Sequence, residues 1–114
     1  MVRRNQRRHV RKAFEATIRI GWQDAKGTDK SALTRSFDIS ESGLSFELWD
    51  PLPIRADVSV RGEKLGLQAR GTVRSCAHKG AKYSIGIEFV GGYRWRPPNE
   101  EIRRSLEEAE MLTV

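Results

Sequence analysis

Residues 36–48, SFDISESGLSFEL, contain two alternating apolar runs separated by a polar turn. The first run carries apolar side chains at positions 37 and 39, and the second at positions 44, 46 and 48. Because neighbouring side chains of a β-strand point to opposite faces, each run predicts a half-buried strand. We expect Phe37 and Ile39 to face the core. Ser36 and Asp38 should then face outward, and Gly43 closes the turn between the two strands.

The same alternation recurs along the rest of the chain. It predicts six strands, at residues 14–22, 32–39, 43–48, 57–62, 65–77 and 83–90. In the fifth strand, Gly66 and Gly71 favour bends or bulges. One helix is expected at about residues 99–111, because Asn99 is a good N-cap and apolar residues follow at helical spacing. This order indicates an all-β fold, a small six-stranded antiparallel β-barrel with a C-terminal α-helix, rather than a doubly wound fold.

Length and composition fit one domain, because the chain has 114 residues and 38% hydrophobic content. No apolar run has the length of a membrane span, and the basic start leads into an alternating strand rather than a signal-peptide core. We therefore expect a cytoplasmic protein. Cys76 is the only cysteine, and His9 and His78 are the only histidines, so a disulfide, a zinc site or a cysteine protease has little support. We expect no metal, no cofactor and no enzymatic activity.

The net charge of +6 is concentrated at one end of the chain. Residues 1–12 contain no acidic side chain, and their basic side chains are Arg3, Arg4, Arg7, Arg8, Arg11 and Lys12. The remainder is neutral overall. We expect residues 1–13 to form a flexible basic arm and residues 14–114 to form the barrel with its helix. Such an arm suits an anion, such as a nucleic acid, a nucleotide or an acidic membrane, although a solvated tail is the simpler interpretation.

The turn of residues 38–43 is a candidate site. Asp38 and Ser40 share the outward face of the predicted second strand, so a carboxylate and a hydroxyl stand side by side. Gly43 allows another backbone or a ligand to approach closely. The alternative is an ordinary hairpin turn whose polar side chains bond local amides.

Two motifs in this order resemble the PilZ domain, the bacterial receptor module for cyclic di-GMP. The first is the R-x-x-x-R spacing within RRHVR at residues 7–11, and the second is the D-x-S-x-x-G spacing within DISESG at residues 38–43. The late strand YSIGIEF, with its glycine and phenylalanine, extends the resemblance along nearly the whole chain. The resemblance implies a six-stranded β-barrel with a C-terminal helix, and cyclic di-GMP as the ligand.

The resemblance also implies roles for individual residues. Arg7 and Arg11 match the two motif arginines and Arg8 the adjacent one, and a guanidinium grips a guanine edge or a phosphate with two hydrogen bonds. Asp38 would accept hydrogen bonds from the N1–H and N2–H groups of guanine, which adenine lacks. Ser40 would add a further hydrogen bond. Gly43 would let the ligand lie close to the turn.

Four further residues are weaker candidates. Arg4 fits the arginine spacing together with Arg8, but it has no secure match in the family motif. Ser84 and Gly86, outward on the sixth strand, would form the floor of the site, and the alternative for Gly86 is a bulge. Trp95 either stacks on a guanine or packs the helix onto the barrel. The other tryptophans, Trp22 and Trp49, are assigned to packing in the core or at its rim.

The resulting hypothesis is a cyclic di-GMP-binding signalling or effector module. Ligand binding would order the N-terminal arm and present an altered surface to a protein partner. Two alternatives remain: a basic β-barrel that binds nucleic acid, and a PilZ-like interaction domain that does not bind the nucleotide. The first alternative accounts for the arginines, but the charge of Asp38 would oppose a polyanion.

Overall fold

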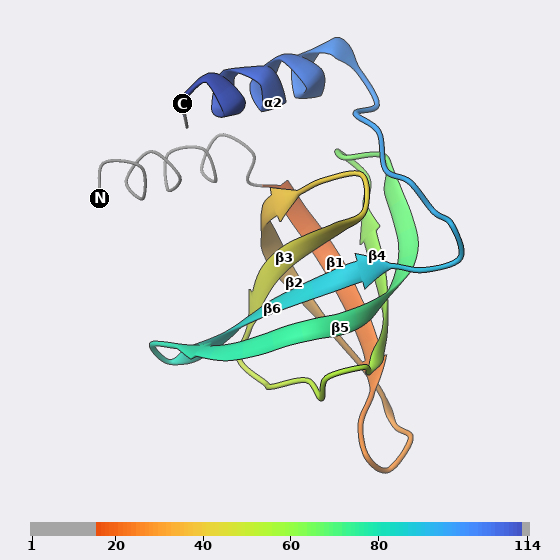
Figure 1. Ribbon diagram of the computed structural model, residues 1–114. Helices are drawn as coiled ribbons and strands as arrows, with labels where there is room; N and C mark the ends of the chain where they lie inside the picture. Colours follow the sequence, from red (N-terminus) through yellow and green to blue (C-terminus); the bar gives the residue numbers. More distant parts are fainter. Residues whose placement is uncertain (1–15, 113–114) are drawn as a thin grey trace.

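The computed structural model describes residues 16–112, except for the side chains of residues 37 and 109–112. The elements in this range are β1 (Ala16–Gln23), β2 (Asp29–Ile39), β3 (Gly43–Leu48), β4 (Asp57–Gly62), β5 (Leu67–Lys79), β6 (Lys82–Phe89) and α2 (Glu100–Leu112). The strands form a closed antiparallel barrel in the order β1-β2-β3-β6-β5-β4, and β4 pairs with β1 to complete the ring (Figure 1). The expected β-barrel with a C-terminal helix is confirmed.

One face of each strand fills the barrel interior. In β1, Ile18 and Ile20 are buried, whereas Arg19 between them is exposed. The strands β3, β4 and β6 alternate in the same way, and Phe46 and Ile85 are among the fully buried side chains. Burying each such side chain stabilises the fold by about 1.5–3 kcal/mol. The interior is therefore apolar, and the polar side chains of the same strands form the outer surface.

A bulge in β2 changes the orientation of its last residues. Ser36 pairs with Phe46, but Asp38 pairs with Ser45, the very next residue of β3, so residue 37 is an extra residue in the ladder. Because of this bulge, Ser36 faces the interior and is 1% exposed, and the prediction that it faces outward is wrong. Asp38, two positions later, lies on the outer face, as predicted. Ile39 packs against the core.

The glycines of the fifth strand behave differently from each other. Gly66 has a φ of 59° just before β5 begins, which confirms a bend there. Gly71 stays in register, and a β carbon at this position would lie 3.1 Å from the carbonyl oxygen of Glu88. Close packing therefore explains this glycine, and the prediction of an irregularity at Gly71 is wrong. The bulge in β5 lies instead between Val73 and Ser75.

The helix α2 begins where the sequence predicts. The side chain of Asn99 accepts a hydrogen bond of 2.9 Å from the backbone N–H of Ile102, which is the expected N-cap. Ile102 is buried against the core and Leu106 partly so, while the helix lies beyond the end of the barrel at which β1 begins (Figure 1). Among residues 16–112, no helix has both the length and the apolar character needed to cross a membrane.

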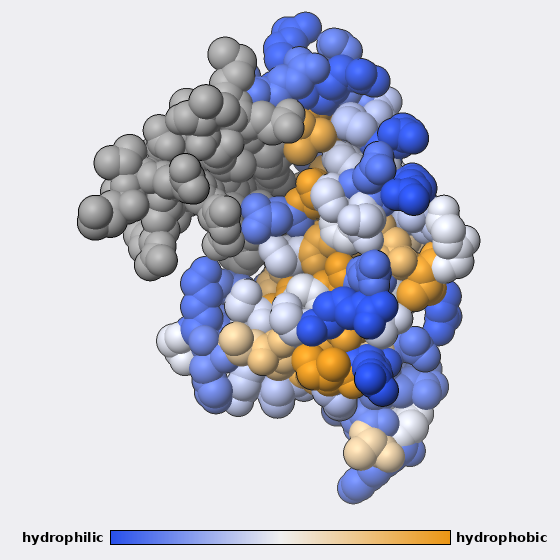
Figure 2. Space-filling view, in the orientation of Figure 1, coloured by the Kyte–Doolittle hydropathy of each residue, from blue (hydrophilic) through white to orange (hydrophobic). Residues whose placement is uncertain are grey.

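In Figure 2, apolar groups are visible along the middle of the coloured surface, interrupted and bordered by hydrophilic side chains. The large apolar side chains that are exposed in the described range are Leu33, Trp49, Ile54 and Val90. They come from different strands and loops. Polar and charged groups therefore dominate what this surface offers to a ligand.

Candidate functional site

The predicted turn motif lies on the outer face of three adjoining strands. Asp38 on β2 pairs with Ser45 on β3, and Ser45 pairs with Gly86 on β6. The hydroxyl of Ser45 is within 3.4 Å of Oδ2 of Asp38, to which it donates a hydrogen bond. We call this surface, centred on Asp38, Ser45 and Gly86, the ligand face. Its carboxylate is half-buried and stands beside a position that has no side chain.

An open depression of about 530 Å³ covers this part of the barrel. Its walls come from the end of β2, the β2–β3 turn, the start of β3, and the neighbouring segments of β5 and β6. Asp38, Ser40 and Gly43 all line it, so the structure brings the three predicted motif residues together. The sequence prediction omitted Ser45, Arg74 and Glu88, which line it as well.

Ser40 stabilises the turn itself. Its backbone N–H donates to the carbonyl oxygen of Gly43 at 2.9 Å, and its hydroxyl accepts a hydrogen bond of 3.3 Å from the N–H of Ser42. This is the local bonding that the alternative interpretation of the turn describes. The Ser40 side chain is exposed, so its surface remains accessible within the depression. Its contact with a ligand stays a prediction.

Gly43 is required by the close approach of a neighbouring backbone. It pairs with Glu88, and a β carbon at this position would overlap the carbonyl oxygen of Ile87. A backbone carbonyl in a β-ladder has little freedom to move aside. The structure therefore explains this glycine without any ligand, and a role in ligand approach stays a prediction.

Gly86 and Ser84 differ in their distance from the motif. Gly86 lies between Ser45 and Ser75, and a β carbon there would come within 2.7 Å of the Ser75 hydroxyl. The bulge proposed for Gly86 lies opposite it, in β5, because the register of β5 shifts at Arg74. Ser84 pairs with Glu47 and Ala77, farther along the strand. Neither Ser84 nor Gly86 is among the described residues that line the depression, so their contact with a ligand stays a prediction.

The sequence also matches a known protein family. The family model of the PilZ domain matches residues 3–108, a range that contains both the arginine motif and the turn motif. The chain belongs to the PilZ family. No curated protein matches the chain. Family membership makes the depression around Asp38 the candidate binding site of a small signalling module.

An ion pair borders the site of this PilZ domain. Nε of Arg74 donates to Oε1 of Glu88 at 2.7 Å, and both side chains are more than half exposed. Arg74 is the extra residue of the β5 bulge, and bulges commonly redirect a side chain at a functional site. The alternation of β6 does place Glu88 outward, so its position was predictable. The orientation of Arg74 depends on the bulge, which leaves no mark in the composition of the strand.

The PilZ turn motif is anchored to the segment that follows β6. Glu41 receives Arg94 on one carboxylate oxygen at 3.2 Å and Arg96 on the other at 3.3 Å. Its backbone oxygen also accepts the N–H of Trp95 at 3.0 Å. Exposed ion pairs each contribute little stability, so the backbone bond and the two pairs together mainly fix the position of the turn.

The three tryptophans of the PilZ domain differ in how deeply they are buried. Trp95 is 3% exposed, and its ring N–H donates a hydrogen bond of 2.7 Å to the carbonyl oxygen of Leu65. The buried ring lies in the same core cluster as Ile102 of α2, which agrees with the packing interpretation, and a contact with a guanine stays a prediction. Trp22 packs partly against the core. Trp49 is 67% exposed at the rim, where Nζ of Lys82 lies 4.8 Å from the ring centroid.

The predicted arginines Arg4, Arg7, Arg8 and Arg11 lie outside the described residues. Their contribution to the site therefore remains a prediction from the family motif. In the described range, no group of three or more His, Cys, Asp or Glu side chains is arranged to hold a metal ion.

Proposed function

We propose that this PilZ domain binds cyclic di-GMP at the ligand face and acts in the cytoplasm as a signalling module without catalysis. The observation that carries the proposal is the position of Asp38. Its half-buried carboxylate stands on the outer surface beside Ser45, in the turn motif of a chain that belongs to this family. A carboxylate in that position offers two acceptor oxygens to one flat edge of a base.

Guanine has the complementary edge. Its N1–H and N2–H groups are two parallel donors, and the Asp38 carboxylate would accept both. The hydrogen bond from Ser45, at 3.4 Å, would help to orient this carboxylate toward the base. Gly86 carries no side chain on the same outer face, so the base would lie flat across β3 and β6. The selectivity for guanine over adenine would thus come from Asp38.

The phosphates need cations, and the N-terminal arm would supply them. Arg7, Arg8 and Arg11 would close over the ligand and form forked hydrogen bonds to a phosphate or to guanine O6 and N7. Each well-placed forked contact contributes about 1–3 kcal/mol, which must also offset the cost of ordering the arm. The ordered arm would present an altered surface to a protein partner.

Isothermal titration with cyclic di-GMP tests this assignment. Asp38→Ala and the double change Arg7→Ala with Arg11→Ala should each remove most of the binding. Asp57→Ala is the matched control, because Asp57 is an exposed carboxylate on β4, which does not contribute to the ligand face. It should leave the affinity unchanged. Equal affinity in all variants would refute the site, and displacement by single-stranded RNA at lower concentration would favour a nucleic-acid-binding barrel.

Hydrogen exchange tests the ordering of the arm separately. Amide hydrogens of residues 1–12 should gain protection when cyclic di-GMP is saturating, while those of the barrel change little. Equal protection with and without ligand would mean that the arm is not a ligand-dependent element.

A further inference from the structure

A row of arginines crosses the outer face of the barrel away from the ligand face. Arg19 on β1 is directly opposite Arg61 on β4, and Arg70 on β5 is a diagonal neighbour of Arg61, because Arg61 pairs with Gln68 and Ser59 with Arg70. All three side chains are exposed. We call Arg19, Arg61 and Arg70 the arginine row.

The charges of the arginine row are not neutralised within the described part of the chain. Like charges in directly opposed strand positions are destabilising, yet no carboxylate between residues 16 and 112 forms an ion pair with any of the three. The nearest acidic neighbours along the strands are Asp57 and Glu63, which flank the row on β4 and just after it. Repulsion between these arginines lowers the stability of the free domain, which indicates that the arginine row serves contact with another molecule.

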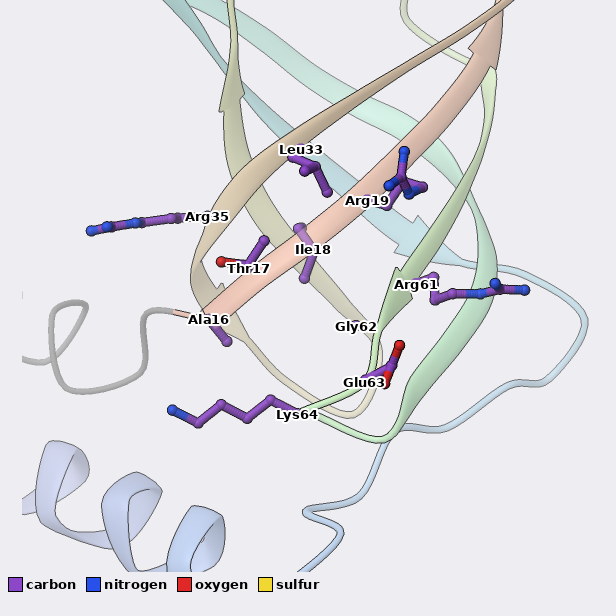
Figure 3. Close-up of a pocket in the computed structure, with 10 residues that line it drawn as sticks. All are labelled: Ala16, Thr17, Ile18, Arg19, Leu33, Arg35, Arg61, Gly62, Glu63 and Lys64. Carbon is purple, nitrogen blue, oxygen red and sulfur yellow. The ribbon is translucent and has the colours of Figure 1, made fainter.

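The row lies in concave surface. A depression of about 700 Å³ is lined by all three arginines and also by Gly21, Ser59, Val90 and Tyr93. A second depression of about 660 Å³ shares Arg19 and Arg61 and adds Arg35 and Lys64 (Figure 3). In Figure 3 the side chains of Arg19 and Arg61 project from adjoining strands to the outside of the barrel. The basic side chains that line the two depressions thus come from four strands and from the turn after β4.

We propose that the arginine row is the docking site for an acidic segment of a protein partner. Arginine guanidinium groups bind carboxylates with paired hydrogen bonds, and charge complementarity gives such contacts their specificity. The exposed Val90 and the half-buried Tyr93 provide an apolar surface for a side chain of the same segment. Because the barrel is closed, the segment is recognised by its side chains and not by addition of a strand.

A nucleic acid fits the row less well. Single strands are held by aromatic side chains on which successive bases stack. Among residues 16–112, Tyr93 is the only aromatic residue that lines the larger depression, and its ring is already in edge-on contact with Phe89 at 5.1 Å between centroids. The geometry therefore favours a peptide with carboxylates on both sides of an apolar residue.

The test uses the full chain and a fluorescein-labelled peptide in which one phenylalanine is flanked by glutamates. Fluorescence anisotropy should show that the wild-type protein binds this peptide. The same peptide with glutamine in place of each glutamate should not bind. Arg61→Glu should weaken binding by about tenfold or more. Lys26→Glu is the matched control, because it makes the same change of charge at an exposed position in the β1–β2 turn, and it should change binding little.

Two further measurements separate the possible causes. Arg61→Glu should raise the melting temperature, because Arg19 then faces an opposite charge, so loss of binding in this variant is not loss of folding. Its affinity for cyclic di-GMP should be unchanged, and the inference does not depend on the nucleotide. Failure of the wild type to bind the peptide would overturn the proposal. So would equal losses in Arg61→Glu and Lys26→Glu, or tighter binding of a single-stranded oligonucleotide to the arginine row.

Discussion

The two sides of the barrel differ in whether their charged side chains form ion pairs. At the ligand face Arg74 is paired with Glu88, and in the adjoining turn Glu41 binds both Arg94 and Arg96. On the β1–β4–β5 side, the arginine row has no such carboxylate within the described residues. Both surfaces are carried by the same closed ring of strands.

This difference separates two uses of an ionic side chain. A paired charge fixes the position of a loop or a strand end, and its own field is largely cancelled nearby. An unpaired charge keeps its field and remains available to a partner, at some cost in stability. Position on the barrel therefore tells more about the role of an arginine than its presence in the sequence does.

The largest expected effect concerns the backbone under the ligand face. Gly43→Ala should reduce stability by about 3 kcal/mol, because the new methyl group overlaps the carbonyl oxygen of Ile87. Gly86→Ala should cost much less, because there the obstacle is the Ser75 hydroxyl, which can rotate. Urea denaturation of both variants measures the difference. Equal stability of the two would show that the β3–β6 contact yields more easily than the geometry indicates.

The next effect concerns base selectivity. Asp38→Ala should weaken cyclic di-GMP binding by about 1–3 kcal/mol and should remove the preference over cyclic di-AMP, because the acceptor for the guanine edge is lost. Competition titration with the two nucleotides measures both quantities. A preference that survives in this variant would assign Asp38 to the turn alone.

A smaller effect, of opposite sign, is expected behind the ligand face. The hydroxyl of Ser36 is buried and has no hydrogen-bond partner within the described part of the chain. Ser36→Ala removes this unsatisfied group and should stabilise the barrel by about 1 kcal/mol. The melting temperature measures the change, and Ser45→Ala serves as the control because its hydroxyl is bonded to Asp38. A loss of stability in Ser36→Ala would mean that the hydroxyl does have a partner in solution.

The smallest effect is expected from removing the carboxylate that pairs with Arg74, which leaves an unpaired arginine on the ligand face as well. Glu88→Gln releases Arg74 from its exposed ion pair, which should cost only about 0.5 kcal/mol of stability. The freed guanidinium lies in the depression with Asp38, so the affinity for cyclic di-GMP should rise about threefold by attraction to phosphate. Titration at low and high salt checks the origin, since only an electrostatic gain falls with salt. Unchanged affinity would place Arg74 outside the reach of the ligand.

The regular parts of the fold were predictable because they follow local rules. Alternation identified the strands and the inward residues of β1, β3 and β6, and Asn99 marked the start of the helix. The bulges near Ser36 and Arg74 were not predictable, because one extra residue in a ladder depends on the partner strand. For the site, the sequence predicted that Asp38 lies outside.

Long-range contacts explain the rest of what the sequence did not reveal. The ion pair of Glu41 with Arg94 and the bond of Trp95 to Leu65 join segments far apart in the chain. The arginine row is of the same kind, because Arg19 and Arg61 become neighbours only when β4 closes the ring. The periodicity of one segment does not reveal which residues of two distant strands become neighbours.

Closure of the barrel also bears on how two binding events would influence each other. Each strand has a hydrogen-bonded neighbour on both sides, so a strand that slides against one neighbour must break its register with the other. The scaffold therefore has no low-energy alternative arrangement through which occupancy at Asp38 could alter Arg61. Within the barrel itself the coupling free energy between the two faces is then close to zero, and only the proposed ordering of the N-terminal arm would carry a signal from one face to the other. The two faces of the barrel would then bind independently, and a partner bound at the arginine row would respond to the nucleotide only if it also contacted the ligand face or the arm.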